Sequence, residues 1–329
     1  ELLSLYPSLM PPTSDFTRAV PPLHDIADVN QLSRGDQALV LKYKQFIGPY
    51  LEEIRGTKAA HGCQMEIDTA LLKLYCENNS NNLHQLVTEN FAVDVGDCVT
   101  WLERYHRYHA LAQLYRTHGD VDKAINIWTR LVDGELTDDT FPGIGFLVDF
   151  LAKLPSHELV WKYADWMLQK DEELGVKIFT NRAVDEPLSD RMRPDLVVDF
   201  LARYPKAVII YLEFLVFQRK LEKEAYHTHL AVLYLDSVLK LLKDPNKQKI
   251  ELDKARSKLR KMLQSSNLYR VQLILGKVKE TDMHAETAIL YGKLGEHDKA
   301  LRILVHKLRD YQRAREILSD QLRGQGACF

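Results

Sequence analysis

The chain has 329 residues, which is more than one hydrophobic core usually serves, so we expect two domains or an elongated repeat. Its 44 Lys and Arg residues nearly balance its 46 Asp and Glu residues, and this balance argues against nucleic acid as a partner. Hydrophobic residues make up 46% of the chain, but they form short periodic clusters rather than the roughly 18 uninterrupted apolar residues of a transmembrane segment. The composition therefore predicts a soluble protein that buries a core.

The cysteines and the two chain ends indicate a reduced compartment and a longer parent protein. Cys63, Cys76, Cys98 and Cys328 show no C-x-x-C spacing, and the N-terminal residues do not resemble a signal peptide. We expect a cytoplasmic location. Because the chain begins without Met, we also expect it to be a piece of something longer.

The first 34 residues contain two Pro-Pro pairs, Pro11-Pro12 and Pro21-Pro22. Proline fixes φ and removes an amide donor, so residues 1–34 are predicted to form an extended arm or linker. Residues 35–329 are predicted to form the folded region, with a soft division near residues 134–145.

Helical periodicity runs through the folded region. From Asp36 onward, apolar residues recur at steps of one, three and three up to Ile54, which predicts an amphipathic helix. Asp68 is predicted to cap a helix through Tyr75, and Pro155-Ser156 to precede one through Met167. Pro194 and Pro205 are predicted in first turns. Further stripes cover residues 226–242, 252–263, 268–275 and 311–322. The alternation of apolar and polar residues that is typical of strands is nearly absent. The sequence therefore predicts an all-α fold with short connections.

One phrase occurs twice: LYRTHGDVDKAI begins at Leu114, and LYGKLGEHDKAL begins at Leu290. In each copy a Tyr lies four residues before a Gly, and an Ala lies five residues after it. A glycine in this place can adopt the left-handed conformation that ends one helix, and a small residue allows the next helix to approach closely. Each copy is therefore predicted to be a helical hairpin, defined by Tyr115, Gly119 and Ala124 in the first and by Tyr291, Gly295 and Ala300 in the second.

The spacing of the two copies favours a repeat. Gly119 and Gly295 are 176 residues apart (295 minus 119), which fits five units of about 35 residues, near the length of tetratricopeptide-type repeats. Looser echoes at Leu74-Tyr75 and Leu233-Tyr234 fall at uneven spacings. We therefore predict an irregular α-solenoid in which each hairpin packs against its neighbours.

Several motifs are candidates for chemical sites. His106 and His109 are three residues apart, which predicts that they share one helix and could form half of a metal site, but no Cys or carboxylate stands beside them at ligand spacing, so packing is the preferred interpretation. The FPGIG stretch at residues 141–145 lacks a preceding strand and a Lys, so it is read as a loop rather than a phosphate cradle. No nucleophile motif occurs. The sequence predicts no catalytic residue, no cofactor and no metal.

Two surfaces remain as candidates for binding. Residues 254–261 form a basic amphipathic stretch that would contact anionic lipid or an acidic partner, although a solvated helix face is the commoner interpretation. Its basic residues are Lys254, Arg256, Lys258, Arg260 and Lys261. Trp161 and Trp166 are candidates for a partner anchor, with core packing preferred for at least one of them.

Five longer segments carry a resemblance to a known family. They are EIDTALLKLYCENN, LVTENFAVDVGDCVTWLERYHRYHALAQLY, ELVWKYADWMLQKDEELGVKIFT, EAYHTHLAVLYLDSVL and ETAILYGKLGEHDKALRILVHKL. From about Glu1 to about Leu318, the chain resembles the central region of the transforming-growth-factor-β receptor-associated proteins. These are similar to the Vps-type subunits of the endosomal tethering complexes HOPS and CORVET.

The resemblance implies a clathrin-heavy-chain-type helical repeat in a CORVET-type subunit that is peripheral on early endosomes. In that family a β-propeller-like domain precedes the repeat and a RING-type zinc module follows it. This sequence contains neither, so no residue of this chain is assigned a role in binding a Rab-type GTPase through the propeller. The implied partners are other class C Vps and CORVET subunits, with transforming-growth-factor-β receptors and Smad-type effectors as further candidates.

Two classes of function follow. The first is a non-enzymatic scaffold that docks tethering subunits or, as an alternative, receptor tails in transforming-growth-factor-β signalling. The second is a regulatory part of an enzyme. Two experiments on the chain distinguish these classes: an assay of hydrolase activity, and a capture experiment with tethering subunits.

Overall fold

The structure, a computed structural model, describes residues 9–12, 34–78, 80–89, 93–182, 192–243 and 249–325. These residues form mainly α-helices joined by turns and loops, with short 3₁₀ and π-helical segments at a few places, and there is no β-strand among them. The prediction of an all-α fold is confirmed. The predicted arm lies outside the described residues except for residues 9–12 and Arg34, and Cys328 lies outside them as well.

The contacts divide the chain into two compact units, Glu1–Leu147 and Val148–Phe329. The helices of unit 1 are α2 (Arg34–Ile54), α3 (Gln64–Asn78), α4 (Asn82–Thr88), α5 (Val95–Arg104), α6 (Tyr108–Thr117) and α7 (Val121–Val132). A 3₁₀ turn, Lys58–Ala60, lies between α2 and α3. Helix α8 (Ile144–Lys153) contains the boundary between the two units.

Unit 2 continues with helices of very unequal length. They are α9 (His157–Lys170), α10 (Glu172–Gly175), α11 (Lys177–Thr180), α12 (Pro194–Leu201), α13 (Pro205–Glu213), α14 (Glu224–Lys243), α15 (Lys249–Ser265), α16 (Val271–Val278), α17 (His284–Lys293), α18 (His297–Ile303) and α19 (Tyr311–Gln325). A π-helical turn follows α13 at Phe214–Gln218 and another follows α18 at Leu304–Leu308.

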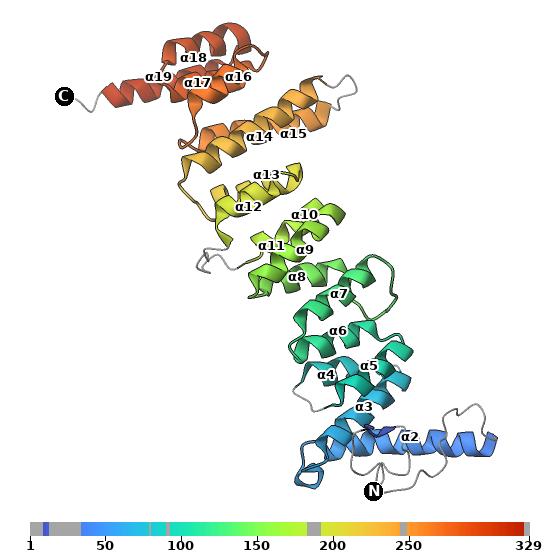
Figure 1. Ribbon diagram of the computed structural model, residues 1–329. Helices are drawn as coiled ribbons and strands as arrows, with labels where there is room; N and C mark the ends of the chain where they lie inside the picture. The colour runs from blue at the N-terminus through green and yellow to red at the C-terminus, as the bar shows by residue number, and fades with distance from the viewer. Residues whose placement is uncertain are drawn as a thin grey trace. The chain divides into compact units, whose positions relative to one another are not determined.

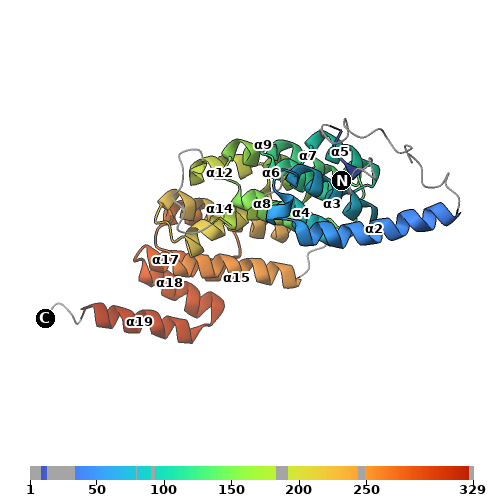
Figure 2. The same cartoon turned by 90° about the horizontal axis from the view of Figure 1, so that it is seen from below.

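Helices that are neighbours in sequence are neighbours in space within each unit (Figure 1). The closest packing joins α6 to α7, α14 to α15 and α17 to α18, and further contacts join helices two apart, such as α3 with α5 and α15 with α17. Figure 2 shows α17, α18 and α19 side by side from a second direction. This short-range packing is typical of solenoid-like folds.

The apolar stripes seen in the sequence become the core. Leu71, Leu114 and Ile125 in unit 1 are almost inaccessible to solvent, as are Leu230 and Leu259 in unit 2. Pro194 and Pro205 lie in the first turns of α12 and α13, as predicted, where a proline costs no helix hydrogen bond. No helix in the described ranges is long and apolar enough to cross a membrane.

Two helix starts differ from the sequence-based predictions. Asp68 does not cap α3, because the helix begins at Gln64, and Asp68 instead accepts a hydrogen bond from Arg55 Nε at 2.8 Å. Helix α16 begins at Val271 rather than Leu268, because the Leu268 amide donates to Ser266 Oγ at 3.1 Å in a local turn.

Two of the buried charged side chains, Lys73 and Glu286, form ion pairs between helices. Lys73 of α3 is 1% exposed, and its Nζ lies 2.5 Å from Asp97 Oδ2 of α5. It also donates to the Met10 carbonyl at 3.1 Å and lies 5.2 Å from the Trp101 ring centre. Glu286 of α17 is 0% exposed and is held by Arg256 of α15. These ion pairs join helices that are two apart in the packing order.

Candidate functional site

The first copy of the repeated phrase is a tight connection between α6 and α7. Gly119 has a φ of +90°, which is left-handed backbone that side chains rarely adopt. Its amide donates to the Arg116 carbonyl at 3.2 Å, and the Asp120 amide donates to the Tyr115 carbonyl at 2.9 Å. This pair of hydrogen bonds is the Schellman arrangement, which closes a helix end by satisfying its last carbonyls.

The second copy, between α17 and α18, has the same geometry. Gly295 has a φ of +74°, its amide donates to the Gly292 carbonyl at 3.1 Å, and the Glu296 amide donates to the Tyr291 carbonyl at 2.9 Å. The same residue types at the same spacing thus close two helices in different units by the same hydrogen bonds.

The small and aromatic residues of the phrase lie where its two helices meet. Ala124 and Ala300 are both 0% exposed, because each lies where two helices pack closely. Tyr115 lies under Lys123, with Nζ 5.3 Å from the ring centre, and Tyr291 lies under Lys299 at 5.4 Å. Each Tyr ring therefore covers the turn through a cation–π contact with the next helix.

Replacement of Gly119 or Gly295 by Val is expected to destabilise the altered hairpin by about 1–3 kcal/mol, because a β-branched side chain is strained at positive φ. Amide exchange measured by mass spectrometry should rise around the altered turn and stay unchanged in the other unit. Gly119→Asn is the matched control, since Asn tolerates this conformation. Wild-type protection in both Val variants would contradict the structural role of the phrase.

The two histidines of the RYHRYH segment do not share a helix, so their placement on one helix was wrong. His106 has a φ of +54° and lies in the turn between α5 and α6, where the Arg107 amide donates to the Leu102 carbonyl at 2.8 Å. His109 lies inside α6 and is buried. The sequence misled because a non-glycine residue closes α5 in the left-handed conformation. No group of three metal-ligating side chains occurs within the ranges that the structure describes.

His109 is the centre of an aromatic cluster in unit 1. Its Nδ1 accepts a hydrogen bond from Trp128 Nε1 at 3.0 Å, and its ring centre lies 5.7 Å from that of Phe141 and 5.3 Å from that of Phe146. Its amide donates to Asp138 Oδ2 at 2.7 Å, so a distant loop carboxylate caps the start of α6. Phe141 belongs to the FPGIG stretch, whose Gly143 has a φ of +94° just before α8.

The stability of unit 1 is expected to fall as pH decreases from about 6.5 to 4. Burial and, to a smaller extent, the neighbouring His84 together lower the pKa of His109 to about 4. The unfolded chain therefore binds a proton in this window that the folded chain does not, and the expected loss is about 2–3 kcal/mol. Chemical denaturation across this pH range measures it. His109→Gln keeps a hydrogen-bond acceptor for Trp128. The variant should take up about one proton fewer than the wild type on unfolding, so its free energy of unfolding should fall less steeply as the pH decreases. Equal slopes of the free energy of unfolding against pH in the two proteins would rule out His109 as the cause.

The basic stretch of α15 divides into internal and external charges. Arg256 donates to both carboxylate oxygens of Glu286, at 3.0 and 2.7 Å, and Arg260 Nε lies 3.6 Å from Glu286 Oε1. Lys258 lies 3.3 Å from Glu213 at the surface. Lys254 and Lys261 are exposed. The two arginines thus serve packing against α17, and contact with lipid or an acidic partner remains a proposal for the three lysines.

The two tryptophans of α9 are half-buried. The Trp161 ring centre lies 5.6 Å from that of Phe179 in α11 and 5.0 Å from that of Phe200 in α12. Trp161 therefore packs between hairpins, which leaves Trp166 as the remaining candidate for a partner anchor.

Sequence reasoning missed Lys73, Glu286 and Asp138. Lys73 stands in the apolar run TALLKLY and Glu286 beside TAIL, so a charge within an apolar stripe was the available signal. Asp138 gave no signal, because its partner, the His109 amide, is 29 residues away.

Comparisons with known proteins show which proteins the chain is similar to. Residues 67–168 match the family described as vacuolar sorting protein 39 domain 1. The chain is 47% identical over 329 residues to transforming growth factor-beta receptor-associated protein 1 of Mus musculus, covering 99% of this chain and 38% of the relative. It is 46% identical to the Danio rerio homolog over 97% of this chain and 37% of that protein.

A more distant relative is the vacuolar protein sorting-associated protein 39 homolog of Drosophila melanogaster, 27% identical over 95% of this chain and 36% of that protein. The chain thus spans about 38% of the length of the curated relatives it matches.

Proposed function

Since nearly the whole chain is similar to transforming growth factor-beta receptor-associated protein 1, and residues 67–168 match vacuolar sorting protein 39 domain 1, we propose that it is the scaffold region of an endosomal tethering subunit of the CORVET type. In this proposal the chain is not an enzyme. It acts by binding other class C Vps and CORVET subunits at the cytoplasmic face of early endosomes.

The observation that carries the proposal is the 47% identity along 99% of the chain. The second support is the packing, because helices that contact mainly their sequence neighbours leave long exposed faces on which partners can dock. The third is the weaker similarity to a vacuolar protein sorting-associated protein 39 homolog, whose name refers to sorting rather than to catalysis.

Capture of purified class C Vps and CORVET subunits by the immobilised 329-residue chain tests the proposal. We expect capture of at least one subunit, and we expect Gly119→Val and Gly295→Val to affect only those partners that dock on the altered hairpin. A fluorescently tagged chain should colocalise with early endosomes. Capture of no subunit would contradict the scaffold role.

The alternative partner is the cytoplasmic tail of a transforming-growth-factor-β receptor, because the names of the Mus musculus and Danio rerio relatives refer to receptor association. The same capture experiment with receptor tails, with and without Smad-type effectors, separates the two roles. Retention of receptor tails without tethering subunits would favour the adaptor role. Hydrolase activity of the purified chain would favour the enzyme-regulatory alternative.

A further inference from the structure

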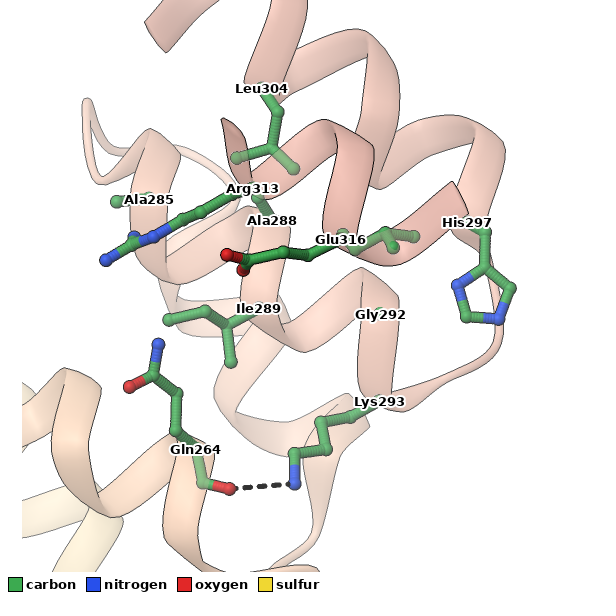
Figure 3. Close-up of a pocket in the computed structure, with 11 residues that line it drawn as sticks. Gln264, Ala285, Ala288, Ile289, Gly292, Lys293, His297, Leu304, Arg313 and Glu316 are labelled. Carbon is green, nitrogen blue, oxygen red and sulfur yellow. Dashed lines mark hydrogen bonds between the residues drawn. The ribbon is translucent and has the colours of Figure 1, made fainter. Parts of the chain in front are cut away.

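Two places in the described part of the chain are candidates for binding a further segment. The groove beside α17 in unit 2 has walls of both charge signs, because Arg313 pairs with Asp310 and Glu316 lines the groove as well (Figure 3). These charges favour no class of occupant. The second place, around Lys73 in unit 1, already holds a segment of the chain, and this segment shows what the site binds.

The arm segment, residues 9–11, is buried in unit 1. Leu9 is 0% exposed, Met10 is 5% exposed and Pro11 is buried, whereas Pro12 is exposed. The segment lies against α3 (Figure 2), where Lys73 Nζ donates to the Met10 carbonyl at 3.1 Å. Met10 and Lys73 are 63 positions apart in the sequence, so this contact joins the predicted arm to the folded region.

The chemistry of the arm segment suits binding as a short peptide. Leu9 and Met10 supply apolar side chains, and Pro11 has no amide hydrogen that needs a partner. The Met10 carbonyl, whose burial without a donor would be unfavourable, accepts from the Lys73 ammonium group. Recognition through a main-chain hydrogen bond and apolar side chains is typical of peptide-binding sites.

The helices of unit 1 form the site without the arm. Lys73 belongs to α3, and its charge is balanced by Asp97 of α5, whose Oδ2 lies 2.5 Å from Nζ. The Trp101 ring centre, also from α5, lies 5.2 Å from the same Nζ. The Met10 carbonyl is a neutral acceptor for an ammonium group that already has its counter-charge. Release of the arm segment therefore leaves the ion pair intact.

Lys73 also supplies something that an apolar residue cannot. Apolar side chains of similar volume would often stabilise a core as well as a buried ion pair does. A lysine, however, has three N–H donors, so it can bind the Asp97 carboxylate and a peptide carbonyl together. Recognition of a carbonyl thus gives a reason for a charge within the apolar run TALLKLY.

The connection to α2 is long enough for the arm segment to act as a tethered ligand. Helix α2 begins at Arg34, and 21 residues (33 minus 12) lie between Pro12 and that start. A ligand on a tether of this length meets its site at an effective concentration of roughly 1 mM. With an intrinsic Kd of roughly 0.1 mM, it occupies the site in about nine of ten molecules.

We propose that unit 1 carries a binding site for short apolar peptides around Lys73, and that residues 9–11 are its intramolecular ligand. The ligand class is a segment with two bulky apolar residues followed by proline, in which the carbonyl before the proline meets Lys73. Such a segment supplied by another chain takes the place of the arm segment. The inference goes beyond the proposed scaffold function and does not depend on which tethering subunit the chain binds.

The test separates the arm from a chain that has already folded. A protease recognition sequence is inserted within residues 13–33 of the 329-residue chain, and the purified protein is cleaved there. At roughly 1 µM, well below the expected Kd, the cleaved arm should leave during gel filtration, and circular dichroism should show unchanged helix in the remainder. A synthetic peptide of residues 3–14 should then bind the cleaved chain with a Kd of roughly 0.1 mM, and the uncleaved chain about tenfold more weakly.

Two variant peptides show whether the arm segment makes the contact. Leu9→Asp brings a charge to a position that is 0% exposed, so it should weaken binding at least tenfold, to roughly 1 mM or above. Pro12→Asp is the matched control, because it introduces the same residue at an exposed position and should bind like the unchanged peptide.

Loss of helix when the arm leaves would overturn the inference, because the arm segment would then be a fixed part of the core. An arm that is neither released at roughly 1 µM nor displaced by roughly 1 mM peptide would overturn it as well. So would equal binding of the Leu9→Asp and Pro12→Asp peptides, or no binding of the unchanged peptide. Because no tethering subunit is used, these failures leave the proposed function standing, and a failed subunit capture leaves this site standing.

Discussion

Replacement of Lys73 by Met is expected to lower the free energy of unfolding of unit 1 by about 3–5 kcal/mol. The change keeps most of the side-chain volume but leaves Asp97, whose side chain is 12% exposed, without the ammonium group 2.5 Å away. A buried charge that loses its partner costs far more than the pair itself contributes. The Met10 carbonyl and the Trp101 ring lose their contacts with Lys73 as well.

Chemical denaturation together with hydrogen exchange of α3 and α5 measures this loss. Lys123→Met is the control, because Lys123 is 64% exposed in its pair with Asp120 and its replacement should change stability far less than Lys73→Met does. The double variant Lys73→Met with Asp97→Leu should recover most of the loss, since it removes both buried charges. A loss of under about 1 kcal/mol for Lys73→Met would show that the pair is more hydrated than its burial indicates.

Replacement of Glu286 by Gln is expected to destabilise the packing of α17 on α15 by about 3 kcal/mol, the lower end of the range for a broken buried pair. Glu286 is 0% exposed, but Arg256 and Arg260 are 26% and 34% exposed, so water compensates part of their lost partner. Without the carboxylate, the two guanidinium groups also repel each other across the helix interface.

Amide exchange in α15 and α17 should rise in Glu286→Gln, whereas unit 1 should keep its protection. Glu280→Gln is the matched control, because Glu280 is exposed after α16. Further replacement of both arginines by Met in the Glu286→Gln background should restore part of the stability, since no unpaired charge then remains. Protection of α15 and α17 as in the wild type would contradict a structural role for Glu286.

The helices and the two hairpin turns could be predicted because their causes are local. The left-handed turns at Gly119 and Gly295 depend on a glycine and on the carbonyls within the preceding five residues, all of them within the repeated phrase. The same local reasoning failed at His106, because a left-handed turn formed there without a glycine to mark it. The prediction that Asp68 caps a helix was wrong for a different reason: α3 begins four residues earlier, at Gln64, and the Asp68 carboxylate accepts a hydrogen bond from Arg55 instead.

The sequence by itself determined that the chain is all-helical, where most helices lie and which phrase closes two of them, because periodicity and turn chemistry depend on residues a few positions apart. Only the tertiary structure decided which charges are buried and which faces are open. Glu286 meets Arg256 from 30 residues away, and Asp138 caps α6 from 29 residues away. Periodicity does not encode such pairings.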